Sequence, residues 1–445
     1  MYRSTFKGGC HPFEGKEMSS TKPVVNLEPG PELVFPLSQH AGAPATPVVK
    51  PGDEVLAGQL IAEANGAISA NIHSSVSGKV KAIQKRPLPT GGVGMSIVIT
   101  NDNEYREVEY KPASLEELSR DQILERIRAA GVVGMGGAGF PTDSKFNPSN
   151  YEKIEYLVVN GAECEPYLTS DYKNMTDSPE KVIGGIKIAL KVLPNARAII
   201  GIEDNKPDAI SIFRDKCSNE PKIEVAKLKT KYPQGSDRML VYATTGKKIS
   251  PKERSNKFGV VVVNVSTLAA VYDAVIEGKP CIERIFTVSG DDIANPGNFR
   301  VRIGTPYNEV LKAAGGTIQD PEKYINGGTM MGFAMYDLTS SVTKTASSLL
   351  ALKKDEVSAN EPPTPCINCG KCGFACPIYL MPNKMYKLAN NGDKEGFLKM
   401  YGDYCIACGC CSYVCPAKIP LKQSFKTMNS IIKAEKKKKR AEVKK

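Results

Sequence analysis

The chain has 445 residues, a formal net charge of +11 and no tryptophan. This length exceeds one ordinary hydrophobic core, and a prior of about 150 residues per domain predicts roughly three domains. The N-terminus lacks a signal-peptide pattern and no stretch reaches the roughly 18 apolar residues of a membrane span, so we expect a soluble protein of a reducing compartment. No basic face carries interleaved aromatic residues, which argues against nucleic-acid binding.

Residues 41–100 are dense in Gly, Pro, Val and Ile with short apolar alternations, which predicts short strands joined by tight turns. Their rhythm resembles the lipoyl and biotinyl carrier fold, in which a lysine on a central hairpin carries the prosthetic group. No lysine occurs between Lys50 and Lys79, and the expected carrier position around residues 65–67 holds no amine. We therefore expect this β-sandwich without carrier chemistry.

A glycine-rich loop follows. Gly134, Gly136 and Gly139 satisfy the pattern GxGxxG, but the loop follows a predicted helix and runs into Phe140 and Pro141. A Rossmann dinucleotide loop leaves a strand and opens a helix, so that fold is not predicted. Such a loop still lets backbone N–H groups converge on a phosphate and lets a flat ring approach closely. An ordinary turn is the alternative.

The middle of the chain predicts an α/β domain with a largely parallel sheet, because strand-like and helix-like segments alternate. Buried strands are expected at 156–163, 196–203, 222–228 and 258–265. Helices are expected at 115–130, where Gly131 is a typical C-cap, and at 178–193, 208–217 and 266–278.

Polar residues follow two of these strands. Asn160, Glu163 and Glu165 come after the first strand, and Asn264 lies at the end of the last. Ligands of parallel sheets gather past the carboxyl ends of strands, so these side chains are candidate ligand contacts. Capping of the following helix is the alternative, since Asn and Glu often do this at strand ends.

Beyond this domain, residues 297–316 predict strand, turn and helix, which is typical of a small β-grasp-like unit. A Pro-rich hinge at 358–365 then leads into a cysteine-rich region.

That region contains the spacing CxxCxxCxxxCP twice. In two-cluster ferredoxins, three thiolates of such a motif hold one [4Fe-4S] cube, while the fourth cysteine, before proline, ligates the other cube. Zinc and disulfides are the alternatives, but neither has a need for a fourth cysteine before proline in both copies. The spacing also excludes Cys410 as a ligand. One predicted cluster has the ligands Cys366, Cys369, Cys372 and Cys415, and the other has Cys405, Cys408, Cys411 and Cys376.

The C-terminal residues 433–445 contain eight Lys or Arg and two Glu, which supplies +6 of the net charge. Clustered lysines can attract an anionic membrane surface or an acidic partner. A solvated, disordered end is the alternative.

Several motifs occur in the order seen in the flavin-bearing NADH-oxidising subunit of respiratory complex I. They are GGAGFPT followed by Lys145, NGAECEP at 160–166, Tyr232 in YPQG, and NVSTLA at 264–269. With the lysine-free sandwich before them and the two cysteine motifs after them, the chain resembles the RnfC subunits of Rnf-type complexes over essentially all of residues 1–430.

The resemblance implies an FMN and NADH site. The positions that match it are Gly134, Gly136, Gly137, Gly139, Phe140, Lys145, Asn160, Glu163, Glu165, Asp171, Tyr232 and Asn264. A plain surface charge is the alternative for Lys145. The complex I subunit has NADE where this chain has NGAE, so an acidic contact is missing here. It also has one cluster motif where this chain has two, which fits a longer electron path.

The resemblance also implies the activity. A flavin accepts two electrons as a hydride and passes them singly, so it can link NAD(H) to the two clusters. The expected protein is a peripheral subunit on the cytoplasmic side of the cell membrane. Its expected partners are the other subunits of an ion-translocating ferredoxin:NAD+ oxidoreductase, together with an iron–sulfur subunit or ferredoxin. The alternatives are a soluble flavin and iron–sulfur reductase, such as a corrin reductase, and a non-enzymatic electron carrier.

No Ser/His/Asp set is present. His11, His40 and His73 all lie near the N-terminus, where surface or packing roles are expected. The predicted chain is therefore a multidomain α/β protein whose chemistry is carried by cofactors. Its expected parts are a lipoyl-like β-sandwich in 1–110, an α/β FMN/NADH-binding domain in 111–285, a β-grasp-like (SLBB-type) region and connector in 286–357, a two-cluster ferredoxin-like domain in 358–430 and a basic tail in 431–445.

Overall fold

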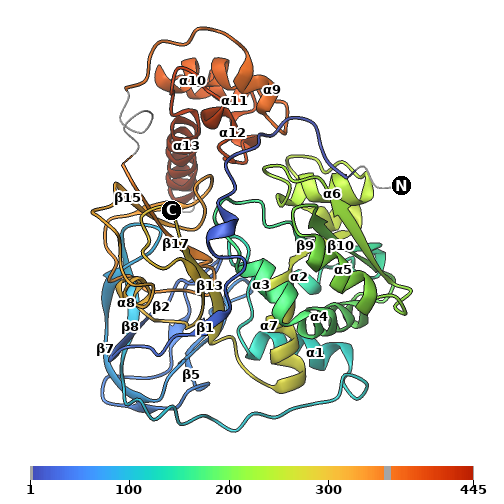
Figure 1. Cartoon of the computed structure of the whole chain (residues 1–445), viewed down its shortest axis with the longest axis vertical. Coiled ribbons are helices and arrows are strands. Elements are labelled where there is room, and N and C mark those ends of the chain that lie inside the picture. Colours follow the sequence, from blue (N-terminus) through green and yellow to red (C-terminus); the bar gives the residue numbers. More distant parts are fainter. Residues whose placement is uncertain (1–3, 355–361, 444–445) are drawn as a thin grey trace.

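A computed structural model describes residues 4–354 and 362–443 of the chain. Figure 1 shows a β-rich lower part, an α/β part beside it and a small helical part above both. The first four residues of the predicted hinge, and the predicted boundary between 357 and 358, lie outside the described residues.

Two small sheets form the N-terminal sandwich, as expected. One has the order β2-β8-β7-β4 and the other the order β3-β5-β6. Inward-facing side chains such as Leu33, Ile61 and Ile97 are fully buried between them. The strands are β2 Glu32–Pro36, β3 Thr46–Pro47, β4 Glu54–Val55, β5 Leu60–Glu63, β6 Ile72–His73, β7 Gly78–Pro87 and β8 Val93–Asn101. Residues 65–67 lie in the exposed turn between β5 and β6.

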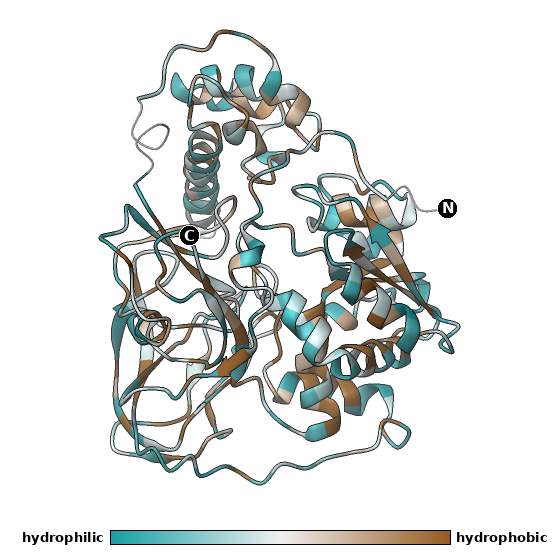
Figure 2. Cartoon of the chain, in the orientation of Figure 1, coloured by the Kyte–Doolittle hydropathy of each residue, from teal (hydrophilic) through white to brown (hydrophobic). Residues whose placement is uncertain are grey.

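The middle of the chain folds as the predicted parallel sheet, with the order β11-β10-β9-β12. Its strands are rich in Val and Ile because helices cover both faces, and Figure 2 shows them as mostly hydrophobic. The strands are β9 Tyr156–Gly161, β10 Arg197–Glu203, β11 Ile223–Leu228 and β12 Val260–Asn264.

Seven α-helices accompany this sheet in the described chain. They are α1 Arg120–Ala129, α2 Thr142–Phe146, α3 Ser170–Asp177, α4 Pro179–Val192, α5 Pro207–Lys216, α6 Asp237–Thr245 and α7 Val265–Tyr272. The first helix begins later than predicted because Ser119 and Gln122 form a capping box. The sequence did not predict α3 and α6, which lie directly after the candidate ligand residues.

The third part of the fold is a mixed sheet with the order β1-β14-β13-β17-β15-β16 and one helix, α8 Tyr307–Ala313. Its strands are β1 Val24–Asn26, β13 Glu283–Ser289, β14 Gly297–Arg302, β15 Lys323–Asn326, β16 Phe333–Met335 and β17 Ser348–Leu352. The predicted strand, turn and helix are present at 297–316. However, β1 comes from the region expected to belong to the sandwich and pairs in parallel with β14. Edge pairing of this kind depends on the tertiary fold.

The cysteine-rich region is a small helical domain. It consists of α9 Lys371–Ala375, α10 Pro382–Asn390, α11 Lys394–Lys399, α12 Cys410–Tyr413 and α13 Leu421–Val443. The basic residues from Lys433 onward continue α13 as one helix, so within the described residues they are not a separate, irregular tail. Lys394 of α11 forms an ion pair with Glu435 of α13. No helix among the described residues is long and apolar enough to cross a bilayer.

The N-terminal segment, residues 4–23, joins these parts. It runs between the α/β domain and the cysteine-rich domain before it reaches β1 (Figure 1). Gly9 N donates to Ala375 O of the cysteine-rich domain at 2.8 Å, and Cys10 exchanges two 2.9 Å backbone hydrogen bonds with Tyr232 of the α/β domain. A Cβ on Gly9 would lie 2.5 Å from Tyr232 O, so the close approach requires glycine here.

Candidate cofactor sites

The glycine-rich loop lies between α1 and α2 and is held from two sides. Met135 N donates to Thr267 Oγ1 of α7 at 2.9 Å. A Cβ on Gly136 would lie 2.8 Å from Asn264 Nδ2, so the loop packs directly on the end of β12. Gly137 is exposed, and a Cβ there would meet nothing within 4 Å. The loop therefore presents bare backbone to open space beside the sheet, as close approach of a flat ring or a phosphate requires.

The carboxyl ends of β9 and β12 meet beside this loop. Asn160 and Asn264 are register partners on the two neighbouring strands. Asn264 Oδ1 caps α7 by accepting from Ser266 N at 2.8 Å, while its Nδ2 donates to Asp171 Oδ2 at 2.7 Å. Ser266 Oγ donates to the other Asp171 oxygen. Asn264 therefore caps α7, as the alternative interpretation expected. The same residue also holds the Asp171 carboxylate of α3 at the edge of the sheet.

Glu163 is a buried cap of α3. Its carboxylate accepts from Asp171 N at 2.8 Å and from Tyr172 N at 3.3 Å. Burial raises the pKa of this carboxyl, and the nearby Lys16 ammonium opposes that effect. Lys16 reaches in from the N-terminal segment and donates to Glu165 O at 2.9 Å. Sequence reasoning missed Lys16 because its partners lie about 150 residues away in the chain.

Glu165 and Tyr232 lie where three domains meet. The Tyr232 hydroxyl lies 3.1 Å from Glu165 Oε1 and 2.8 Å from Cys408 O of the cysteine-rich domain. Met330 N, in the loop between β15 and β16, donates to the other Glu165 oxygen at 3.1 Å. One hydroxyl donates only one proton, and burial raises the pKa of Glu165. The hydroxyl proton of Tyr232 therefore serves either Glu165 Oε1 or Cys408 O, and its hydrogen bond to Glu165 opposes the effect of burial on this pKa.

Lys145 and Phe140 lie on the far side of the glycine loop. Lys145 Nζ donates to Val262 O of β12 at 2.9 Å, so this half-buried ammonium is directed at the sheet. The Arg254 guanidinium lies over the Phe140 ring, 5.4 Å from its centroid. Asn160 Nδ2 donates to Gly235 O at 2.8 Å, which ties β9 to the loop before α6. The structure thus gathers the predicted residues into two groups, one around the glycine loop and one around Glu165 and Tyr232.

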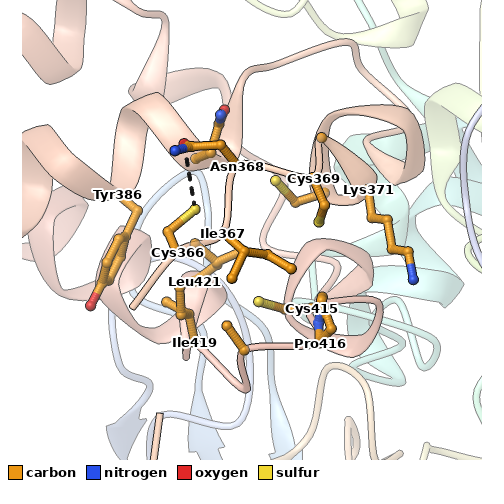
Figure 3. Close-up of a pocket in the computed structure, with 14 residues that line it drawn as sticks. Cys366, Ile367, Asn368, Cys369, Lys371, Tyr386, Cys415, Pro416, Ile419 and Leu421 are labelled. Carbon is orange, nitrogen blue, oxygen red and sulfur yellow. Dashed lines mark hydrogen bonds between the residues drawn. The ribbon is translucent and has the colours of Figure 1, made fainter. Parts of the chain in front are cut away.

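The eight motif cysteines surround two cavities. Figure 3 shows the first, here called the outer cavity. Four thiols line it: Cys366, Cys369, Cys372 and Cys415. The second, here called the inner cavity, is lined by Cys376, Cys405, Cys408 and Cys411. Each cavity therefore takes three cysteines from one motif and the fourth from the other, which is the crossed grouping that the spacing predicts.

The cavities provide the donor set of a cluster. Four motif thiols lie around each cavity, and four cysteine ligands are what a [4Fe-4S] cube takes. Burial raises the pKa of the Cys405 thiol to about 11, so a bound cation is needed to hold it as a thiolate at neutral pH.

Cys410 also borders the inner cavity but is engaged elsewhere. Its Sγ lies 3.5 Å from Cys10 Sγ of the N-terminal segment and 3.8 Å from Tyr232 O. Its exclusion from the predicted ligands is consistent with these contacts.

The fold and these sites define a flavin and iron–sulfur electron-transfer protein, and comparisons with known proteins agree. The matching family models are the RnfC Barrel sandwich hybrid domain (residues 4–104), the Nuo51 FMN-binding domain (127–273), the SLBB domain (285–334) and the 4Fe-4S dicluster domain (363–439). They follow the chain order predicted from sequence.

Curated relatives match most of the chain. The C subunit of the proton-translocating ferredoxin:NAD(+) oxidoreductase complex of Clostridium ljungdahlii is 44% identical, covering 86% of this chain and 83% of the relative. The C subunit of the Na(+)-translocating complex of Acetobacterium woodii is 42% identical over 88% of this chain and 89% of the relative. The C subunit of the ion-translocating oxidoreductase complex of Pseudomonas aeruginosa is 40% identical over 88% of this chain but 51% of its own length. The chain belongs to the family of these proteins, the RnfC family.

Proposed function

We propose that this chain is the peripheral, NAD(H)-oxidising and NAD(H)-reducing subunit of an Rnf-type ion-translocating ferredoxin:NAD+ oxidoreductase. It lies on the cytoplasmic side of the cell membrane and works with the other subunits of that complex. Its cofactors are FMN and two [4Fe-4S] clusters, with NAD(H) as substrate. The bound flavin supplies the exchange between a two-electron hydride carrier and one-electron clusters.

One observation carries this proposal. The 2.8 Å contact between the Tyr232 hydroxyl and Cys408 O joins the α/β domain to the wall of the inner cavity. Tyr232 and Glu165 belong to the α/β domain that carries the glycine loop, while Cys408 is a predicted cluster ligand. This contact supports electron exchange between a flavin in the α/β domain and the clusters, whereas a separate reductase domain and electron carrier would need no such junction.

The residues of the chain have distinct parts in this function. The glycine loop (Gly134, Gly136, Gly137 and Gly139) admits the flavin, and Phe140, Lys145, Asn160, Asp171 and Asn264 bound the same site. Glu163 fixes the start of α3, and Glu165 and Tyr232 form the junction with the inner cluster. Cys366, Cys369, Cys372 and Cys415 hold the outer cluster, and Cys376, Cys405, Cys408 and Cys411 hold the inner one.

Anaerobic reduction of the reconstituted chain tests the proposal. We expect NADH to reduce both clusters, observed by electron paramagnetic resonance, and to reduce ferricyanide faster than NADPH does. Purification from detergent-extracted membranes should recover the partner subunits. A chain that binds clusters but no flavin, and that NADH does not reduce, would be an electron carrier only.

A further inference from the structure

The outer cavity is open to solvent on one side. Cys369 is exposed, whereas Cys376, Cys408 and Cys411 of the inner cavity are each 8% exposed. Two large apolar side chains lie in or beside the wall of this cavity. Ile367 lines it and is 67% exposed, and Phe374, which is 85% exposed, lies 3.6 Å from where a Cβ on the lining residue Gly370 would stand. Side chains of this kind, gathered beside a single redox centre, are typical of an interaction surface.

The charge around this opening has one sign. Residues 362–392 and 404–434 contain seven lysines and no Asp or Glu. Lys371 lines the outer cavity, and Lys418 follows Ala417 in its wall; both are exposed. Neither forms an ion pair with any residue that the structure describes. In contrast, Lys422 donates to Met330 O at 2.6 Å and Lys426 lies over the Phe333 ring, so these two face the mixed sheet.

We propose that this outer face, made of Ile367, Cys369, Lys371, Phe374 and Lys418, is the docking surface for an acidic protein or domain that carries a one-electron iron–sulfur centre. The proposal rests on the proposed function and deepens it. Exposed apolar side chains supply the contact, and the lysines select and steer a negatively charged partner. Figure 3 shows Lys371 and Cys369 on the same side of the cavity.

The reaction at this face is a single electron transfer. The partner's centre is oxidised by one electron and the outer cluster is reduced by one, or the reverse, and no bond or proton changes place. A second copy of this chain does not fit the face, because two basic surfaces repel. An anionic membrane offers charge complementarity but no electron donor. The experiment therefore includes membrane binding as the competing result.

The experiment compares variants of the outer face with matched variants elsewhere. Phe374→Ser and Lys418→Glu alter the face. Ile318→Ser, at a side chain that is 62% exposed, and Lys312→Glu, at an exposed lysine of α8, make the same chemical changes on the mixed sheet. Each is assayed as the isolated chain and in the assembled complex, with a reduced acidic two-cluster ferredoxin as the probe and NAD+ as acceptor.

We expect the outer-face variants to raise the KM for ferredoxin at least about tenfold, the size of effect that loss of charge steering gives. The wild-type rate should fall as ionic strength rises, and Lys418→Glu should weaken this dependence while Lys312→Glu keeps it. NADH:ferricyanide activity, flavin content and both cluster signals should stay unchanged, as they should in the controls. Failure of the proposed function would instead remove NADH:ferricyanide activity from the wild-type chain.

Equal ferredoxin kinetics in outer-face variants and controls, with clusters intact, would overturn the docking proposal. So would a loss of binding to phosphatidylserine vesicles without any change in the ferredoxin reaction, because that result assigns the face to a membrane.

Discussion

The inner and outer cavities have the same cysteine spacing but different surroundings. The inner cavity is covered by segments from three other parts of the chain: Cys10 lies against Cys410, Tyr232 contacts Cys408, and Lys422 holds the Met330 loop. Among the described residues, those that line the outer cavity all belong to the cysteine-rich domain, and Cys369 in its wall is exposed.

The motif spacing thus predicts which cysteines line each cavity, while the neighbouring segments determine how far each cavity is covered. An exposed cluster edge can pass electrons to another protein, and a buried one can receive them from a site within the same chain. We therefore infer the order flavin, inner cluster, outer cluster, partner. The N-terminal segment contributes to this order, since a Cβ on Gly8 would lie 2.8 Å from Cys376 O and only glycine lets the segment pass there.

The largest expected effect tests the crossed grouping, in which the fourth cysteine of each cluster comes from the other motif. Cys376→Ser should remove the inner cluster and leave the outer one, and Cys415→Ser should do the reverse. Each variant should keep about four of about eight iron atoms, because each cube needs four thiolates. Iron and sulfide analysis with electron paramagnetic resonance on both variants measures this. If each substitution disturbs the cluster of its own motif, the crossed grouping is wrong.

Loss of the flavin should prevent NADH from reducing either cluster. Gly137→Val places a branched side chain in the open space beside the loop, so we expect a folded protein with at least about tenfold weaker FMN binding, a loss of about 1.4 kcal/mol. Dithionite should still reduce both clusters. Gly134→Ala adds a smaller side chain to the same loop, where its Cβ would meet Phe140 only at an ordinary 3.7 Å, so it should weaken FMN binding less. Retention of flavin in a folded Gly137→Val variant would contradict the site.

Tyr232→Phe should change the midpoint potential of the inner cluster and leave that of the outer cluster unchanged. It removes the hydroxyl that lies 2.8 Å from Cys408 O and leaves a buried carbonyl without this donor, at a cost of about 1–3 kcal/mol. A redox titration followed by electron paramagnetic resonance should show a shifted midpoint potential for the inner cluster and none for the outer. Equal shifts in both would mean a general loosening of the domain.

The raised pKa of Glu165 predicts a smaller effect on stability. Burial raises the pKa of this carboxyl above its ordinary value of 4.5 in the unfolded chain. The folded protein then holds the proton more tightly, so the free energy of unfolding falls as pH rises above 4.5, until the folded carboxyl has ionised. Glu165→Gln resembles the protonated form and should flatten this part of the stability profile in denaturant titrations. An unchanged slope would indicate that Glu165 is already ionised.

The basic end of α13 should have the smallest effect on the isolated chain. Lys394–Glu435 is its one ion pair in the described structure, and exposed pairs of this kind contribute about 0–1 kcal/mol. Deletion of residues 433–445 should leave both clusters and NADH:ferricyanide activity intact. We expect the truncated subunit to wash off membranes at lower salt, because each lysine near an anionic surface contributes about 1 kcal/mol. Release of both forms at the same salt concentration would show that this end is only solvated.

Local sequence predicted most of the elements and the grouping of the motif cysteines around two cavities. Cysteine spacing acts over a few residues, so Cys366, Cys369 and Cys372 reveal their joint role without any knowledge of the rest of the chain. Long runs of Val and Ile likewise predict β9, β10 and β12 as buried parallel strands. The polar helix α3 has no apolar run to reveal it, and its start is fixed by Glu163, which lies outside the helix.

Tertiary structure alone decided which residues meet at the junction. Three contacts join distant segments: Lys16 with Glu165, Cys10 with Cys410, and β1 with β14. The first two pairs are 149 and 400 residues apart in the chain, and no local pattern encodes such contacts. The same holds for the difference between the two clusters. Their motifs are equivalent in sequence, yet distant segments cover one cavity while Cys369 of the other stays exposed, because solvent access depends on packing in space and not on spacing along the chain.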